Sequence, residues 1–194
     1  MSVRKQIPYK SGTFFITFTN AGFLSLFELT NSYDLVYNFF DILKSKGHFV
    51  NAYVIMPNHV HAILSFTHTE KSINRIIGDG KRFMAYELVK RLRENEQFEI
   101  LDKLKNFVNK DDKAKGKIHE VFEPSFDWKE CIDDNIIEQK LNYIHMNPCV
   151  YKPRLASTPC QYRHSSATYY LGEGKIHYEI SHITQMKDIN FDVK

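Results

Sequence analysis

Two of the nine histidines, His59 and His61, are separated by a single residue in the segment MPNHVHAIL. Residues 51–66 are apolar and β-prone on both sides of a Pro-Asn turn, which predicts two strands with the histidines at the start of the second. Side chains two residues apart on a strand point the same way, so both imidazoles are expected on one face of the sheet. Two imidazoles on one strand face provide half of a divalent-metal site, although a pair of solvated histidines fits the same spacing.

A second segment, NYIHMNP, places Tyr143 and Asn147 four residues apart on a predicted helix. Residues at this spacing lie on the same helical face. A tyrosine hydroxyl has a pKa of about 10, so it becomes a nucleophile only beside a metal-polarised electrophile or a base. Together, the two segments offer a metal site, a nucleophile and a neutral oxygen ligand.

The same residues also fit less specific roles. Tyr143 can be a core residue of an amphipathic helix, and Tyr86 and Tyr151 compete with it as nucleophile candidates. Asn147 can equally be the C-terminal cap of its helix, just before Pro148.

The composition is that of a globular protein, because 43% of the 194 residues are hydrophobic and 25% are charged. No apolar run is long enough to cross a bilayer, and the N-terminus lacks the apolar core of a signal peptide. The cysteines follow no zinc-binding spacing, which indicates reduced thiols and a cytoplasmic location: Cys131, Cys149 and Cys160. The net charge of +3 permits a nucleic-acid partner without requiring one.

Local patterns predict the elements that position the candidate residues. Strands are expected at residues 13–19, 48–56 and 59–66, and an irregular one, broken by Pro124, at 121–132. Helices are expected at residues 33–46, at 72–92 with interruptions at Gly78 and Gly80, and at 135–146 with Pro148 as a stop signal. Residues 94–116 begin as a helical pattern and end in a charged, flexible loop.

This order of elements, β-α-β-β-α-(α)-β-α, resembles the ferredoxin-like split βαβ pattern. In that pattern, helices cover one face of an antiparallel sheet, giving an α+β fold. We expect one catalytic domain over residues 1–171 and a polar C-terminal tail over residues 172–194.

The motifs together resemble a known family. MPNHVHAIL is similar to the histidine–hydrophobic–histidine motif of single-tyrosine transposases, the HUH class. NYIHMNP, followed by YRHSSA, resembles the branch called REP-associated tyrosine transposases. The resemblance covers roughly residues 13–170, with the motifs in the family's order.

This resemblance implies a ferredoxin-like or RRM-like fold, dependence on Mg²⁺ or Mn²⁺, and single-stranded or hairpin DNA as the substrate. It implies that His59, His61 and Asn147 are metal ligands. Tyr143 would be the nucleophile of a strand transferase that forms a 5′-phosphotyrosine intermediate and leaves a free 3′-OH. The sequence departs from the family pattern at His164, where the family usually has tryptophan, and at Ser125, where a basic residue is common.

Lys81, Arg82 and Arg163 are the predicted contacts to DNA phosphates, although a solvated helix face or a packed turn also explains them. Two other functions remain open. One is a domesticated hairpin-DNA-binding protein with little catalysis, and the other is a metal-dependent phosphodiester hydrolase. No membrane partner is expected, and both a monomer and a homodimer fit the sequence.

Overall fold

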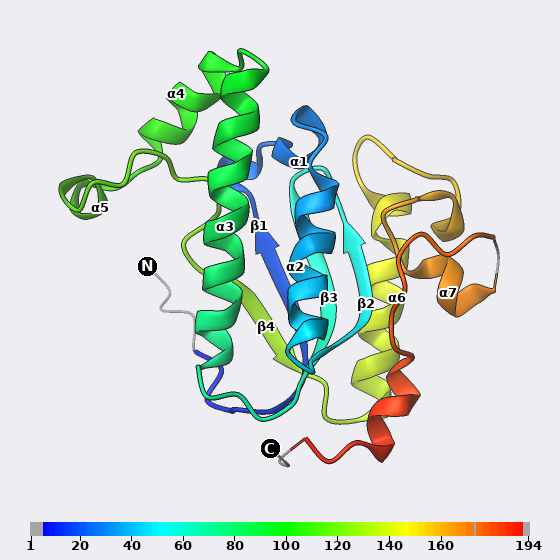
Figure 1. Ribbon diagram of the computed structural model, residues 1–194. Coiled ribbons are helices and arrows are strands. Elements are labelled where there is room, and N and C mark those ends of the chain that lie inside the picture. The colour runs from blue at the N-terminus through cyan, green and yellow to red at the C-terminus, as the bar shows by residue number, and fades with distance from the viewer. Residues whose placement is uncertain (1–5, 173, 192–194) are drawn as a thin grey trace.

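A computed structural model describes residues 6–172 and 174–191. Its centre is a four-stranded antiparallel sheet in the order β2-β3-β1-β4 (Figure 1). The strands are β1 (Gly12–Thr19), β2 (Phe49–Ile55), β3 (His59–Phe66) and β4 (Asp127–Glu130). This order confirms the predicted ferredoxin-like sheet, in which the two central strands are β1 and β3.

Helices fill the connections between these strands. They are α1 (Leu26–Leu29), α2 (Tyr33–Ser45), α3 (Ile73–Glu94), α4 (Phe98–Asn106), α5 (Lys110–Ala114), α6 (Asp134–Val150) and α7 (Ala167–Leu171). Short 3-10 turns occur at Ala21–Phe23, Pro159–Gln161 and Ile183–Asp188. None of the helices within the described ranges combines the length and apolarity needed to cross a bilayer.

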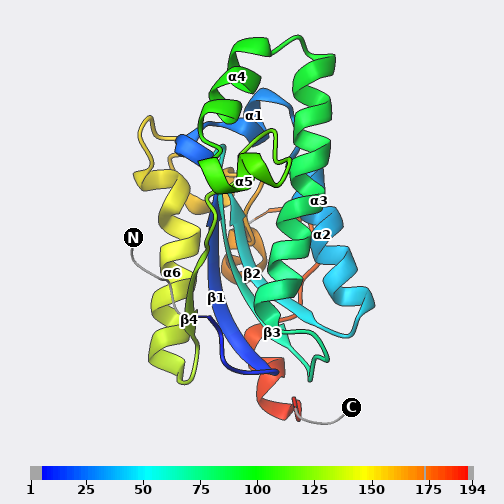
Figure 2. The ribbon, with the colours of Figure 1, turned by 90° about the vertical axis from the view of Figure 1, so that its left-hand side faces the viewer.

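Helices cover both faces of the sheet, which corrects the expectation of one covered face. Figure 2 shows α2 and α3 on one side of the strands and α6 on the other. On β3, Val60 and Leu64 pack in the cluster shared with α2 and α3, whereas Ile63 packs in the cluster that contains Ile144 of α6. β2 and β3 are buried along nearly their whole length, so both of their faces need a covering layer.

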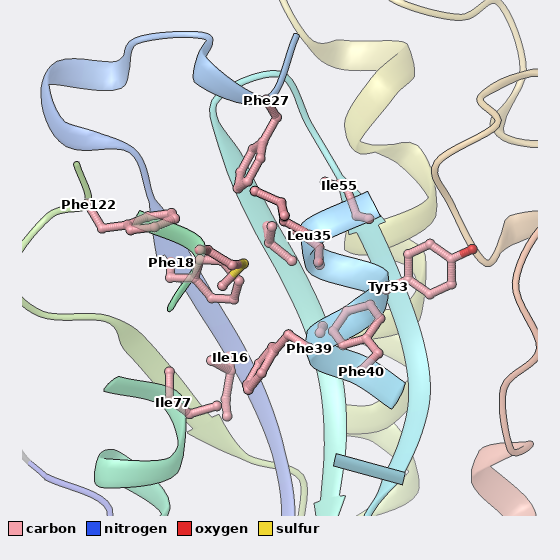
Figure 3. Close-up of a cluster of buried hydrophobic side chains, with 14 of the residues drawn as sticks. Ile16, Phe18, Phe27, Leu35, Phe39, Phe40, Tyr53, Ile55, Ile77 and Phe122 are labelled. Carbon is pink, nitrogen blue, oxygen red and sulfur yellow. The ribbon is translucent and has the colours of Figure 1, made fainter. Parts of the chain in front are cut away.

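The larger core lies between the sheet and the helices α2 and α3. Figure 3 shows Phe39 and Phe40 of α2 beside Ile16 and Tyr53 of the sheet. α3 is unbroken, although two glycines were expected to interrupt it. Gly80 lets the two helices approach, because a Cβ there would lie 2.4 Å from the Phe39 ring.

Two helix boundaries differ from the prediction. The charged segment expected as a loop contains α5, which begins where the Asn109 side chain accepts a hydrogen bond from the Asp112 amide. α6 continues through Pro148 to Val150, so the prediction of Pro148 as a stop signal is wrong. Proline removes only one amide donor here, and the Tyr151 amide still donates to the Asn147 carbonyl, 3.0 Å away. The expected break at Pro124 is confirmed, since β4 begins at Asp127.

The described part of the predicted C-terminal tail, residues 174–191, packs on the domain. Ile180, Ile183 and Met186 are buried, and the Ser181 amide donates a 3.0 Å hydrogen bond to the Val50 carbonyl. This segment therefore extends the cover of β2. Residues 1–5, 173 and 192–194 of the predicted domain and tail lie outside the described residues. The boundary between residues 171 and 172 stays a prediction.

Candidate functional site

His59 and His61 lie at the start of β3, on the face that α6 covers. They pair with Thr19 and Thr17 of the central neighbour β1. Their ring centroids are 4.6 Å apart, so the strand brings the two imidazoles together as the alternation of side chains predicts. His61 is buried, and only 5% of it is exposed.

Hydrogen bonds orient both rings. The Nδ1 of His59 donates to the Asn58 Oδ1, 2.6 Å away, because a carbonyl oxygen can only accept. This bond leaves the His59 Nε2 as the nitrogen with a lone pair. The Nδ1 of His61 shares a 2.6 Å hydrogen bond with the Thr17 hydroxyl. The Nε2 of His61 is buried and has no hydrogen-bond partner within the described residues.

A buried ring nitrogen without a partner is costly unless something else binds it. The second nitrogen of each metal-bound histidine normally makes a hydrogen bond that fixes the ring, as both Nδ1 atoms do here. The two side chains therefore fit a divalent cation that takes their Nε2 atoms.

Burial keeps both imidazoles neutral. Desolvation lowers the pKa of His59 to about 4, partly offset by a hydrogen bond to the Asn147 side chain. Desolvation also lowers the pKa of His61 to about 3, with further lowering from the nearby charges of His59 and Lys140. Neutral imidazole is the form that binds a metal, so both residues are in that form at pH 7.

Asn147 reaches the histidines from α6. Its side chain is buried and hydrogen-bonds to His59. The alternative role as a C-terminal cap is wrong, because α6 ends three residues later, at Val150, and Tyr151 takes the cap position. The described residues contain no cluster of three His, Cys, Asp or Glu side chains that could hold a metal. Any ion here would thus have two imidazoles and one amide as its protein ligands, all of them neutral.

Tyr143 lies on α6 one turn before Asn147 and faces the same site. Its ring centroid is 4.9 Å from that of His61 and 5.9 Å from that of Phe15. Tyr143 is 48% exposed, so about half of the residue faces solvent. The competing Tyr151 is also close, with its ring 6.3 Å from that of His59. Tyr86 lies on α3, which covers the opposite face of the sheet, and is therefore no longer a candidate.

Lys140 also lies at this site, although it was not among the residues predicted from the sequence. Its ammonium lies 4.7 Å from the centroid of the Phe15 ring and 5.9 Å from that of Tyr143. In the described part of the chain, no carboxylate forms an ion pair with it. The signal was available in the sequence, because Lys140 precedes Tyr143 by three residues on the same helix.

Of the three predicted DNA contacts, one side chain is buried and two are exposed. Lys81 is buried, and its ammonium donates to the carbonyls of Glu123 and Ser125 at 2.7 and 3.2 Å. The prediction that Lys81 contacts phosphates is therefore wrong: the side chain holds the segment before β4 in place. Arg82 has an exposed side chain and pairs with Asp79 at 3.1 Å. Arg163 is exposed as well, so both arginines remain proposed phosphate contacts.

The YRHSSA segment is mostly structural. The Tyr162 hydroxyl donates to the Ile55 carbonyl, and Ser165 forms an isolated β-bridge with Val54. His164, which departs from the family pattern, stacks on Tyr33 with ring centroids 3.8 Å apart. These contacts hold the segment against the edge of β2 and against α2.

No protein-family model matches the sequence, and no curated protein matches it either. Among solved structures, the chain is similar to a REP-associated tyrosine transposase bound to a REP hairpin. The TM-score is 0.62 at 15% sequence identity, and the alignment covers 93% of each chain. The two proteins therefore share a fold along nearly their whole length.

A candidate transposase from Deinococcus radiodurans R1 is also similar, with 17% identity over 73% of this chain and 95% of that one. Its TM-score of 0.39 is too low to support an argument about fold or function.

Proposed function

We propose that the protein is a metal-dependent endonuclease and strand transferase that cuts single-stranded or hairpin DNA through Tyr143. The observation that carries this proposal is the 4.9 Å separation between the rings of Tyr143 and His61. The Tyr143 ring lies beside the imidazole of His61, whose buried Nε2 has no hydrogen-bond partner in the described residues, and this proximity supports Tyr143 as the nucleophile. The shared fold with a protein that binds a REP hairpin supports hairpin DNA as the substrate class.

His59, His61 and Asn147 are the residues that would hold the ion. Bound there, a divalent cation supplies Lewis-acid chemistry toward a phosphate oxygen. Of the two ions that the family resemblance implies, Mg²⁺ is held mainly by oxygen ligands and water, whereas Mn²⁺ also accepts imidazole nitrogen, so Mn²⁺ is the better probe of this site.

Tyr143 performs the covalent step. Its oxygen forms a bond to the phosphorus while the bond from phosphorus to the 3′ oxygen breaks. The tyrosine loses its proton and the 3′ oxygen gains one, which leaves a 5′-phosphotyrosine and a 3′-OH. Attack by a 3′-OH on the phosphotyrosine reverses the step and rejoins a strand. The exposure of Tyr143 suits this role, because the substrate must approach its hydroxyl from solvent.

Lys140 and the neutral ligand set favour an anionic substrate. The ammonium of Lys140 lies beside Tyr143, and it can stabilise the developing phenolate or a phosphate oxygen. Two imidazoles and an amide leave the charge of a divalent ion uncompensated. A phosphodiester would offset part of this charge.

The test is incubation with Mn²⁺ and a hairpin DNA that carries a single-stranded extension labelled on the 3′ side of the cut. The proposal predicts a labelled protein–DNA adduct that survives denaturation. Metal-dependent cleavage without an adduct would show a hydrolase instead, and DNA binding with neither product would show a binding protein.

A further inference from the structure

A turn with an unfavourable backbone conformation lies beside the candidate site. It is the 3-10 turn Ala21–Phe23, which follows β1. The backbone of Phe23 is left-handed, with a φ of 56°. Glycine adopts this conformation at no steric cost, and asparagine and aspartate tolerate it, but a bulky residue in it is an outlier.

Packing does not account for Phe23. The residue is 70% exposed, so its ring contributes little to the core. The described residues include two other non-glycine residues with positive φ, Asn31 and Glu96, and both have polar side chains. Phe23 thus combines a strained backbone with an exposed aromatic ring, which the fold alone does not require. Strained residues cluster at functional sites, where the surrounding structure holds them in place.

The Asn58 side chain links this turn to His59. Its Nδ2 donates a 3.1 Å hydrogen bond to the Phe23 carbonyl, and its Oδ1 accepts the 2.6 Å bond from the His59 Nδ1. Asn58 is buried, so water does not compete for either bond. A single side chain therefore connects the backbone of Phe23 to one of the proposed metal ligands.

Further hydrogen bonds fix the turn against the residues that precede β3. The Asn20 amide donates to the Asn58 carbonyl at 2.8 Å, and the Phe27 amide donates to the Pro57 carbonyl at 3.1 Å. These bonds flank Phe23 on both sides in sequence, so its backbone is held against the loop that leads into the histidines. Figures 1 and 2 both show α1, which follows the turn, at the end of the sheet where α6 has its carboxyl end.

We propose that the Phe23 ring stacks on an unpaired base beside the phosphodiester that Tyr143 attacks, and thereby positions that phosphodiester at the metal ligands. The inference rests on the proposed function and adds to it a residue that places the substrate. Every base has a flat face that stacks on an aromatic ring, so this contact fixes a nucleotide without reading its sequence. A ring that is held in place before the substrate arrives loses little conformational entropy on binding, which offsets the cost of the strained backbone.

Phe98 provides the matched control. Single exposed apolar side chains are normal on protein surfaces and need no function. Phe98 is such a residue, because it is 60% exposed at the start of the helix α4. Phe23 differs from it in two respects, which are the left-handed backbone and the link through Asn58 to His59.

The experiment uses a DNA hairpin with a single-stranded extension in which 2-aminopurine replaces one base at a time. Stacking on an aromatic ring quenches the fluorescence of this base, and the titration is done without metal so that cleavage does not interfere. At one position, the complexes of the wild type and of Phe23→Tyr should be less fluorescent than those of Phe23→Leu and Phe23→Gly. The two variants without a ring should also bind about tenfold more weakly, whereas Phe98→Ala should behave like the wild type.

Thermal unfolding separates this role from a structural one. Glycine tolerates the left-handed backbone, so Phe23→Gly should unfold at the temperature of the wild type or above it, although it loses the stacked base. A lower unfolding temperature of Phe23→Gly, with fluorescence like that of the wild type, would show that the ring supports the fold and would overturn the proposal.

The rate of adduct formation distinguishes a failure of this inference from a failure of the proposed function. With Mn²⁺ and DNA below saturation, Phe23→Leu should form the Tyr143 adduct about tenfold more slowly than the wild type, and Phe23→Tyr should restore the rate. Equal rates in the wild type and Phe23→Leu, or equal fluorescence at every position, would overturn the role of Phe23 and leave the proposed function standing. Fluorescence that depends on the ring, without an adduct in any of the proteins, would support the stacked base and contradict the proposed function.

Discussion

The ring of Tyr143 meets the ring of His61 edge to face, with centroids 4.9 Å apart and planes inclined by 71°. The two residues belong to α6 and β3, and Phe15 of β1 completes the contact, 5.5 Å from His61. This contact exists only because α6 crosses the face of the sheet that α2 and α3 leave open. The placement of one helix therefore assembles the candidate site from three elements that are distant in sequence.

The two glycines of α3 should respond in opposite ways to alanine. Gly78→Ala should raise the free energy of unfolding by roughly 0.5–1 kcal/mol, because alanine favours the helix and meets no neighbour. Gly80→Ala should lower it by about 1–3 kcal/mol, because the new carbon overlaps the buried Phe39 ring. Urea unfolding of the two variants measures both values. Shifts of the same sign would contradict the packing described here.

His164 should make the fold sensitive to acid. Burial, together with the charges of His177 and Arg163, lowers the pKa of His164 to about 4. Between pH 6.5 and 4, the unfolded chain therefore binds a proton that the folded chain does not, and stability falls as the pH is lowered through this window. His164→Gln keeps a partner for the Tyr37 hydroxyl but cannot be protonated. Because His164 is only partly buried and solvent screens part of the effect, this substitution should reduce the loss in unfolding free energy between pH 7 and pH 4 by no more than roughly 2 kcal/mol. Equal losses in both proteins would rule out this role.

The strands of the sheet could be predicted from local sequence, because runs of β-branched and aromatic residues are typical of strands whatever their partner strands are. The shared face of His59 and His61, and that of Tyr143 and Asn147, could also be predicted from local sequence. Each follows from the periodicity of side chains along a single strand or helix. These predictions used no information about neighbours in space.

Some errors were local, at the glycines of α3, at α5 and at Pro148, whereas the others concern which elements meet. The burial of Lys81 depends on carbonyls of Glu123 and Ser125, 42 and 44 residues away in sequence, so a helical pattern could not reveal it. The face that α6 covers was equally hidden, because β2 and β3 are apolar on both sides and show no alternation. Lys140 could have been predicted from its spacing of three residues from Tyr143, but its contact with the Phe15 ring, which lies on another element, could not.

Removing the charge of Lys140 should slow the chemistry more than it weakens binding. Lys140→Met should lower the single-turnover rate of adduct formation by about ten- to a hundredfold, because a cation near the Tyr143 ring is lost. Lys140→Arg should restore most of the rate. Lys187→Met, which removes an exposed lysine paired with Asp134 at the start of α6, is the control. A purely structural Lys140 would leave the rate unchanged and lower the thermal stability.

Mn²⁺ binding should depend on the histidine pair. Replacing both His59 and His61 with alanine should abolish Mn²⁺ binding in calorimetry, and Asn147→Ala should weaken it at least tenfold. His68→Ala, which alters an exposed histidine outside the site, should bind Mn²⁺ like the wild type. Circular dichroism checks that the double variant still folds, because His61 is buried against Thr17. Wild-type affinity for Mn²⁺ in the double variant would show that His59 and His61 do not hold the metal.

The most direct test is to locate the covalent attachment. After reaction of the wild type with Mn²⁺ and hairpin DNA, nuclease digestion and tandem mass spectrometry should find a nucleotide phosphate on Tyr143. Tyr143→Phe should lose the adduct and the cleavage while it keeps its affinity for DNA, since only one hydroxyl is removed. Tyr151→Phe, which alters the other tyrosine near His59, should form the adduct normally. An adduct that persists in Tyr143→Phe, or that maps to Tyr151, would contradict the assignment of the nucleophile.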